Sequence, residues 1–280
     1  MEHVKLNNNV EIPILGLGTF QLNNPEICER SVFEAIKIGY RLIDTAQAYN
    51  NEESVGNAIV RCGVPRDQLF ITTKVWFRSY EHADAERSIL ESLRKLKVDY
   101  IDLVLLHWPF GNYYAAYRVL ESFYAAKKIR AIGVSNFNPD RLIDLIKFNK
   151  VVPVVNQVET NLLYQQEDAN RWMKKYNVRH QAYAPLGQGK KNQMYENPAL
   201  VKIAKKYGKS PQQIALKFQL QRGIIVIPKS QHVERIRENF SLFDFVLTEA
   251  EMKTLRGMDE KVPLTGAPEK PELVETAMTW

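Results

Sequence analysis

Short apolar runs alternate along this chain with segments whose apolar residues recur every three or four positions. The short runs are typical of buried strands, and the longer spacing is typical of amphipathic helices. We predict strands at residues 14–17, 41–44, 70–74, 101–107, 131–135, 154–157, 179–184 and 224–227. We predict helices at residues 26–38, 53–61, 83–96, 114–126, 139–148, 167–176 and 211–221. The last of these begins with Ser210-Pro211, a capping hydroxyl followed by proline at the first helical position.

The predicted strands lack polar alternation, as expected when both faces of a sheet are covered. Eight strand–helix repeats within about 250 residues are typical of a (β/α)8 TIM barrel. A doubly wound open sheet is the alternative, but it usually has a glycine-rich turn after its first strand. Here that position reads Gly16-Leu17-Gly18-Thr19-Phe20, with no third glycine and no helix opening at once. We therefore predict an α/β TIM barrel with an N-terminal β-hairpin, whose turn is Asn7-Asn8-Asn9.

The chain shows no Pro/Gly/Ser-rich linker and no low-complexity tract. We predict that residues 1–280 form a single domain, with the hairpin in residues 1–13 and a C-terminal tail in residues 260–280. The tail carries Pro263, Pro268 and Pro271, so we expect it to run over the surface. We leave open whether Trp280 folds back over a pocket or is disordered.

Composition narrows the class of protein. Apolar residues make up 45% and charged residues 25% of the chain, as in ordinary soluble proteins. Cys28 and Cys62 have no metal or redox spacing, which favours a reducing, cytoplasmic setting. No secretory leader and no span of about 20 apolar residues is present, so we predict a protein that binds no membrane. We also predict a monomer. The formal net charge of +6 comes from scattered basic residues. This distribution favours a phosphate-bearing small ligand over nucleic acid.

Four residues with acid–base chemistry lie at or near the ends of predicted strands. Asp44, Lys74 and His107 each end an apolar run, and Tyr49 follows Asp44. In a TIM barrel the carboxyl ends of the strands form the active-site face. Other polar residues also end strands, namely Ser135, Asn136, Asn156, Gln157, Tyr183, Lys229 and Ser230.

The four residues together could deliver a proton to an oxygen on which negative charge develops. A nearby ammonium lowers the pKa of a tyrosine, which is otherwise near ~10. A carboxylate would keep Lys74 charged and oriented, and a neutral histidine could donate a second hydrogen bond to the substrate oxygen. We therefore expect Lys74 to lower the pKa of Tyr49.

Each of the four residues also has a structural interpretation. Asp44 could cap a helix starting near Glu52, and Tyr49 could be a packed aromatic. Lys74 could simply be solvated, and His107 could be a core histidine satisfied by the backbone. Taken singly, these interpretations are favoured, but the joint arrangement favours a catalytic site.

The sequence resembles the aldo-keto reductases in motifs that occur in order along nearly the whole chain. These are the residues 16–20, 43–46 with Tyr49, 71–76, 105–109, 132–137, 156–159, 183–187 and 227–230. The short connections after the fourth and seventh strands make it most similar to the bacterial 2,5-diketo-D-gluconate reductase group. Phe20 stands where many relatives have Trp, and Ala184 where many have Ser.

The resemblance implies a catalytic tetrad of Asp44, Tyr49, Lys74 and His107, with Tyr49 as the general acid in reduction. It implies NADPH as cofactor and a small-molecule carbonyl as substrate. The cofactor contacts that it implies are Gly18, Thr19, Ser135, Asn136, Gln157, Tyr183, Leu186, Gln188, Gly189, Lys229, Ser230, Arg235, Glu238 and Asn239. Within this set Tyr183 would stack on the nicotinamide. The substrate contacts are Phe20, Trp76 and Trp108.

The stretch 229–239 bears on which nicotinamide is used. Lys229, Arg235 and the Ser230 hydroxyl near a helix N-terminus could hold the 2′-phosphate of NADP, and by the resemblance Glu238 and Asn239 would contact the adenine. A basic helix face in water is the alternative.

Two other functions stay open. The protein could be a sensor or regulatory subunit that binds NADPH, with turnover incidental. It could be a Schiff-base barrel lyase that uses Lys74 as its amine. A metal-dependent hydrolase is disfavoured, because the five histidines show no ligand spacing, and we predict no metal site.

Overall fold

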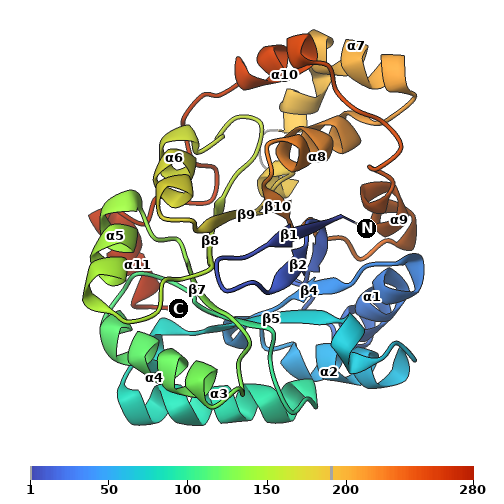
Figure 1. The fold of residues 1–280 in the computed structure, drawn as a ribbon. Coiled ribbons are helices and arrows are strands. Elements are labelled where there is room, and N and C mark those ends of the chain that lie inside the picture. Colours follow the sequence, from blue (N-terminus) through green and yellow to red (C-terminus); the bar gives the residue numbers. More distant parts are fainter. Residues whose placement is uncertain (1, 190–191) are drawn as a thin grey trace.

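The computed structural model describes residues 2–189 and 192–280, and its centre is a barrel of parallel strands (Figure 1). The strands are β3 (Gly16–Gly18), β4 (Leu42–Asp44), β5 (Phe70–Val75), β6 (Leu103–Leu106), β7 (Ile132–Ser135), β8 (Val155–Glu159), β9 (Arg179–Tyr183) and β10 (Ile225–Val226). They lie in the order β10-β9-β8-β7-β6-β5-β4-β3. A parallel bridge between Leu15 and Val226 joins the two edges. The predicted TIM barrel is confirmed, and each strand boundary differs from the prediction by at most two residues.

The N-terminal hairpin closes one end of the barrel. Strand β1 (His3–Lys5) pairs antiparallel with β2 (Glu11–Pro13), and Figure 1 shows the pair lying across the barrel strands. Leu6 and Ile12 of this hairpin are buried in one cluster with the barrel residues Leu42, Phe70 and Leu105. The predicted hairpin is therefore confirmed, and it leaves the opposite end of the barrel open.

The predicted helices are present with bounds within one residue of those expected. They are α1 (Pro25–Ile38), α2 (Glu52–Arg61), α3 (His82–Leu96), α4 (Tyr113–Ala125), α5 (Pro139–Phe148), α6 (Glu167–Lys175) and α8 (Pro211–Gln221). Ser210 caps α8 as predicted, in a capping box with Gln213. Since this box satisfies two backbone N–H groups at once, it sets where the helix begins.

Four further helices were not predicted. They are α7 (Pro198–Tyr207), α9 (Val233–Phe240), α10 (Glu249–Arg256) and α11 (Pro271–Ala277). The tail runs over the surface as expected, since most of its residues are exposed, but it also forms α11 and buries Ala277. Two of the four had readable start signals, Asn197-Pro198 before α7 and the Thr248–Glu251 capping box of α10. Helices this short depend on tertiary packing more than on their own propensity.

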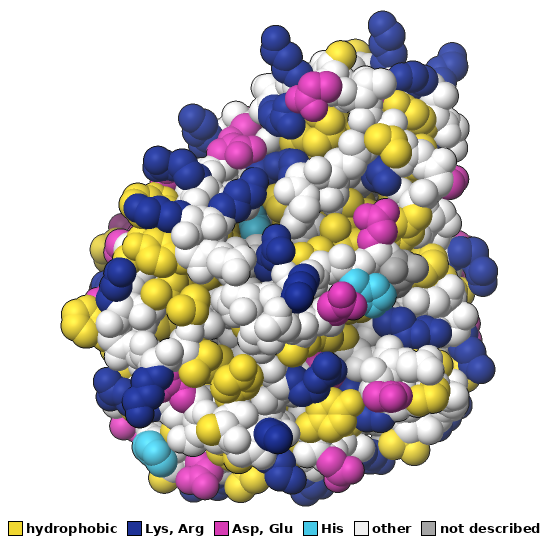
Figure 2. Space-filling model, viewed as in Figure 1, with side chains coloured by type: hydrophobic (Ala, Val, Ile, Leu, Met, Phe, Trp, Pro, Cys, Tyr) yellow, Lys and Arg dark blue, Asp and Glu magenta, His cyan; other side chains and the backbone are white. Residues whose placement is uncertain are grey.

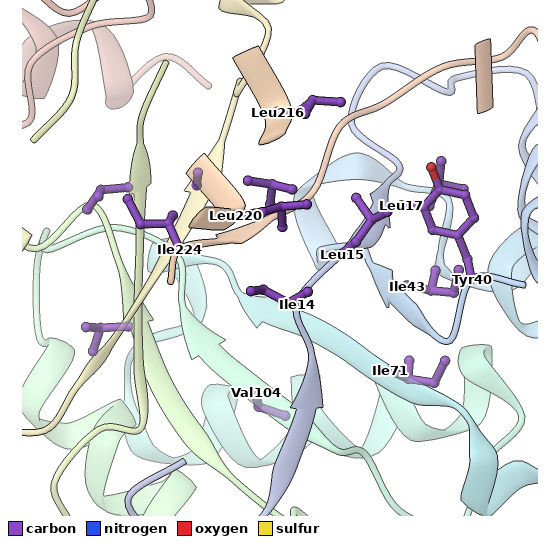
Figure 3. Close-up of a cluster of buried hydrophobic side chains, with 14 of the residues drawn as sticks. Ile14, Leu15, Leu17, Tyr40, Ile43, Ile71, Val104, Leu216, Leu220 and Ile224 are labelled. Atoms are coloured by element: carbon purple, nitrogen blue, oxygen red, sulfur yellow. The ribbon is translucent and has the colours of Figure 1, made fainter. Parts of the chain in front are cut away.

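Side-chain alternation along the strands creates two hydrophobic layers. Inward-facing residues fill the barrel together with the hairpin, whereas Ile43, Ile71 and Val104 face outward into a larger cluster beneath the helices. Figure 3 shows part of that outer cluster, which includes Leu15 and the α8 residues Leu216 and Leu220. The interior is thus packed, and ligands are confined to its open end.

Two glycines allow this interior to fill. A Cβ on Gly133 would lie 2.7 Å from Leu105 Cδ2 and 2.7 Å from the Val155 carbonyl oxygen, and one on Gly16 would lie 2.4 Å from Leu42 Cγ. At both positions the backbone of one strand comes very close to a side chain or backbone atom of a neighbouring strand. Any larger residue would push the barrel strands apart.

His180 of β9 makes stability depend on pH. It is buried and its Nε2 lies 2.7 Å from Thr160 Oγ1. Burial, with the charges of Arg222 and Lys174, lowers the pKa of His180 to about 3. The unfolded chain, with a histidine pKa near ~6.5, therefore binds a proton that the folded chain does not. The stabilisation from neutral His180 is complete at pH values above the pKa of the unfolded chain. It is lost as the pH falls toward the lower pKa of His180 in the folded chain.

We therefore expect the free energy of unfolding to fall by ~1.4 kcal/mol per pH unit from this residue alone below pH ~6.5. Urea unfolding at pH 7 and pH 5 checks this. His180→Gln should reduce the pH dependence by that amount, whereas His82→Gln, at an exposed position of α3, should not. An unchanged slope in His180→Gln would contradict the assignment.

Candidate active site

A cleft of about 1590 Å³ opens at the carboxyl ends of the barrel strands. Every residue that the sequence suggested for catalysis, cofactor binding or substrate binding lines this cleft, with one exception. The exception is Lys74, which lies fully buried beneath it. The structure thus brings the predicted residues together in one place, while their individual roles remain predictions.

Lys74 and Asp44 form a buried ion pair on neighbouring strands. Lys74 Nζ donates to Asp44 Oδ1 over 2.5 Å and to the Thr45 carbonyl oxygen over 2.9 Å. Burial raises the pKa of Asp44 and lowers that of Lys74, and their mutual attraction opposes both changes. Asp44 does not cap α2, whose N-cap is Asn51. The pair therefore serves the cleft and not the helix.

Tyr49 places its phenol above this pair. It ends the short 3-10 helix Gln47–Tyr49, and its hydroxyl lies 3.4 Å from Lys74 Nζ. Its ring lies 5.0 Å from the ring of Phe20 and edge-on to His107 at 5.6 Å. The half-buried phenol is thus fixed between the ion pair and the open cleft.

The expected lowering of the Tyr49 pKa was wrong. Burial raises the pKa of Tyr49 well above its usual value, and the charge of Asp44 raises it further. The expectation considered the Lys74 charge but not the burial of the phenol, which is the larger effect, nor the repulsion between a phenolate and Asp44. Tyr49 therefore keeps its proton at neutral pH, which is the state that a general acid needs.

His107 follows β6 and faces Tyr49 across the cleft. Burial and the Lys74 charge lower the pKa of His107 well below its usual value, so the imidazole is neutral. Its buried Nδ1 has no hydrogen-bond partner within the described part of the chain. Such an orphaned polar atom is unusual in a core. This does not fit a core histidine satisfied by the backbone, and because the His107 ring also lines the cleft, it fits a group that meets a ligand.

Polar side chains from three strands form the floor beside the tetrad. Tyr183 Oη donates to Asn136 Oδ1 over 2.9 Å, and Ser135 Oγ lies 3.2 Å from Asn136 Nδ2. Gln157 Nε2 donates to Asp44 Oδ2 over 2.8 Å and to Gln181 Oε1 over 3.1 Å. No pattern in the sequence pointed to the hydrogen bond between Gln157 and Asp44, which joins this floor to the tetrad.

The loop after β9 turns the backbone along the cleft. Ala184, Gly187, Gln188 and Gly189 all have positive φ, of 46°, 72°, 52° and 76° respectively. This conformation favours glycine, and Leu186 is held between these residues by a hydrogen bond from Tyr195 Oη to its carbonyl oxygen of 2.9 Å. The predicted loop residues therefore present a compact turn to the cleft.

The opposite side of the cleft is basic. Lys229 and Arg235 are exposed along it, and buried Ser230 lies between β10 and α9. Glu238 and Asn239 of α9 line the same part of the cleft. We predicted a phosphate site in residues 229–239, and the side chains named for it line the same part of the cleft.

The remaining end of the cleft is aromatic. Trp76 and Trp108 both lie close to Trp280, whose ring is 6.1 Å from the first and 5.5 Å from the second. Phe20, 45% exposed, lies beside Tyr49. The placement of Trp280 was left open by the sequence, and the structure puts it in the cleft. No local pattern could have signalled this contact, because it joins the last residue to strands far earlier.

The described residues contain no group of three or more His, Cys, Asp or Glu side chains that could hold a metal ion. Nor do any of their helices have the length and apolarity needed to cross a membrane. Figure 2 shows Lys and Arg side chains spread over the visible face with Asp and Glu between them. The positive charge of the chain is therefore not gathered into a single patch on this face.

Comparisons with known proteins agree with the geometry. The model of the Aldo/keto reductase family matches residues 14–260. Glyoxal reductase of Bacillus subtilis (strain 168) is 43% identical over 262 residues, which cover 92% of this chain and 94% of that protein.

Two solved structures share the fold. One is an aldo-keto reductase enzyme from a Medee basin deep-sea metagenome library, 42% identical with a TM-score of 0.93, covering 95% of this chain and 98% of that one. The other is a Bombyx mori aldo-keto reductase in complex with NADP, 33% identical with a TM-score of 0.90, covering 95% of each chain. With its motifs in order and its family match over most of its length, the chain belongs to the aldo/keto reductase family.

Proposed function

We propose that this protein reduces aldehydes and ketones to alcohols with NADPH. One observation supports the proposal above the others. The Tyr49 hydroxyl lies 3.4 Å from the ammonium of a buried Lys74–Asp44 pair and faces neutral His107 across an open cleft. This arrangement holds a protonated acid where a carbonyl oxygen could enter.

The residues of the chain divide the chemistry among them. Tyr49 gives its proton to the carbonyl oxygen, and the charge of Lys74 stabilises the phenolate that results. Asp44 keeps Lys74 in place, and Gln157 holds the second oxygen of Asp44. Neutral His107 orients the carbonyl by a hydrogen bond. NADPH, when bound, supplies the hydride.

The cleft has the donor set that NADPH requires. Amide groups of Asn136 and Gln157 lie beside Tyr183 at the tetrad end, where a carboxamide could bind. Because the amide nitrogen of the Gln157 side chain donates to Asp44, the amide oxygen of that side chain is the group that would accept from the carboxamide. Lys229 and Arg235 offer positive charge at the far side of the same cleft, where a 2′-phosphate could bind. The Bombyx mori relative in complex with NADP supports the same choice.

The substrates that we propose are dicarbonyls, keto-sugars and aromatic aldehydes. The glyoxal reductase relative supports the first of these, and the Trp76, Trp108 and Trp280 wall supports the last. We further propose a single-domain, cytoplasmic monomer. Two buried free cysteines, Cys28 and Cys62, support the reducing compartment.

NADPH consumption, followed by absorbance against a panel of these carbonyls, tests the proposal. Turnover on at least one class is expected. Tight binding without turnover on any carbonyl would favour the sensor. Borohydride trapping of Lys74 would reveal the Schiff-base lyase. The Lys74 amine, however, is fully buried, is hydrogen-bonded to Asp44 and does not line the cleft. The structure therefore disfavours the lyase.

Removing Arg235 should abolish most of the preference for NADPH over NADH. A hydrogen bond to a charged group contributes roughly 1.5–3 kcal/mol, so Arg235→Ala should raise the KM for NADPH roughly 10- to 100-fold and leave that for NADH unchanged. Arg237→Ala is the matched control, because Arg237 is exposed on the same helix but does not line the cleft. Steady-state kinetics with both cofactors measure the effect. Equal KM changes for the two cofactors would contradict the 2′-phosphate assignment.

A further inference from the structure

Another buried carboxylate, Glu159, lies outside the tetrad and is hydrogen-bonded to Thr265, which lines the cleft. It ends β8, two positions after Gln157, so both side chains point to the same side of the strand. Glu159 is only 3% exposed. A buried carboxylate is costly unless hydrogen bonds satisfy it, and the proposed mechanism gives this one no task.

The hydrogen bonds of Glu159 come mainly from the C-terminal segment. Its Oε1 accepts from the backbone N–H of Leu264 over 2.8 Å, and its Oε2 accepts from the backbone N–H of Thr265 over 2.9 Å and from Thr265 Oγ1 over 2.5 Å. Asn161 Nδ2 adds a bond to Oε1 of 3.1 Å. Both carboxylate oxygens therefore hold a segment more than 100 residues away in the sequence.

This held segment touches the cofactor side of the cleft at two points. Thr265 Oγ1 lies 3.3 Å from Tyr183 Oη, which in turn donates to Asn136. A Cβ on Gly187 would lie 3.4 Å from Leu264 Cδ1, so the Leu264 side chain packs against the loop after β9. Since an ionised carboxylate only accepts, the Thr265 hydroxyl donates its one proton to Glu159. The weaker contact of 3.3 Å is therefore a shared use of the Tyr183 proton, which goes mainly to Asn136 and partly to the Thr265 oxygen.

The same segment continues to the substrate side. It forms α11, Arg78 Nη2 donates to the Met278 carbonyl oxygen over 2.8 Å, and Trp280 then packs against Trp76. One stretch of chain thus runs from the Tyr183 hydroxyl to the aromatic wall. Glu159 fixes one end of this stretch and Arg78 fixes the other.

We propose that Glu159 is a positioning residue for the cofactor. By holding Leu264 and Thr265, it fixes the Tyr183 hydroxyl and, through it, Asn136. This inference rests on the proposed use of NADPH. It implies that NADPH binding and order in residues 264–280 favour each other, because each stabilises the same contacts. A carboxylate that merely anchored the tail would leave NADPH affinity unchanged.

A pair of Thr265 variants tests the central contact with little change in shape. Thr265→Val removes the hydroxyl, and we expect the Kd for NADPH, measured by fluorescence titration, to rise roughly 3- to 10-fold, as for the loss of one or two hydrogen bonds. Thr265→Ser keeps the hydroxyl and should stay within about twofold of wild type. Near-ultraviolet circular dichroism confirms that each variant is folded.

Glu159→Gln and Arg78→Ala separate the two ends of the segment. Glu159→Gln replaces one accepting oxygen with an amide NH2 group, which cannot accept from the backbone N–H groups. It should raise the NADPH Kd roughly 10- to 100-fold. Arg78→Ala releases the Met278 end, and should raise the KM for the carbonyl while changing the NADPH Kd far less than Glu159→Gln does. In hydrogen exchange, NADPH should protect residues 264–280 in wild type and Thr265→Ser, but not in Glu159→Gln.

The outcomes distinguish this inference from the proposed function. If wild type binds NADPH and both Glu159→Gln and Thr265→Val bind it equally well, the positioning role is wrong and the reductase proposal stands. A loss in Thr265→Ser as large as in Thr265→Val would also overturn it, because the hydroxyl would not be the cause. If wild type does not bind NADPH, the proposed function fails and this inference fails with it.

Discussion

Replacing Tyr49 with Phe should lower kcat for carbonyl reduction by about 10²- to 10⁴-fold, the usual contribution of a positioned general acid. The variant removes only the hydroxyl that lies 3.4 Å from Lys74 Nζ. The ring contacts with Phe20 and His107, at 5.0 and 5.6 Å, do not depend on that hydroxyl. NADPH affinity should therefore be preserved, so the loss falls on the chemical step and not on cofactor binding.

Stopped-flow measurement of NADPH oxidation in a single turnover, beside a fluorescence titration of NADPH, checks this result. Tyr117→Phe is the matched control. Tyr117 is also buried and its hydroxyl donates to the Val151 carbonyl oxygen over 2.9 Å, but it does not line the cleft. That variant should keep its activity. If Tyr49→Phe kept kcat within a few-fold of wild type, another group would have to supply the proton.

Replacing Lys74 with Met should cost both activity and stability. The apolar side chain is of similar length, but it leaves Asp44, which is 1% exposed, without its cation. Removing one partner of a buried ion pair typically destabilises by about 3–5 kcal/mol, because the other charge stays buried. Catalysis should also be lost, since nothing then stabilises the Tyr49 phenolate.

The dependence on pH identifies the cause of this instability. Without Lys74, the pKa of Asp44 should rise further, so the folded variant binds a proton that the unfolded chain releases above its ordinary carboxyl pKa. Stability of the variant relative to wild type should therefore recover as pH falls through the raised Asp44 pKa. Urea unfolding at several pH values measures this.

The double variant Asp44→Asn with Lys74→Met provides the control, because it removes both charges. It should be more stable than Lys74→Met alone, with a coupling free energy in the double-mutant cycle of roughly 0.5–3 kcal/mol. Activity should stay low in both. A single variant as stable as wild type would mean that Asp44 finds another way to satisfy its charge.

The convergence of the tetrad could be predicted from the sequence. Asp44, Lys74 and His107 each close an apolar run, and parallel strands in a barrel bring their carboxyl ends to one rim. The strand positions followed from local apolar runs, which encode burial directly. For the same reason, the helices with strong amphipathic spacing were found to within one residue.

The pKa of Tyr49 could not be predicted in the same way. Its value depends on how deeply the phenol is buried and on the Asp44 charge beside Lys74, and both are properties of the packed site. An argument from residue types sees the ammonium but not the water that is excluded. The direction of the shift therefore came from the structure and was opposite to the expectation.

What the sequence determined by itself was the barrel, its hairpin and the rim on which the acid–base residues meet, because periodicity and strand-end chemistry are local. The contacts across long sequence distances were decided only by the tertiary structure. Gln157 reaches Asp44, Glu159 holds Thr265, and Trp280 returns to Trp76. No local pattern encodes such pairs, since each forms only when the closed barrel and the returning C-terminal segment bring distant side chains into the same small volume.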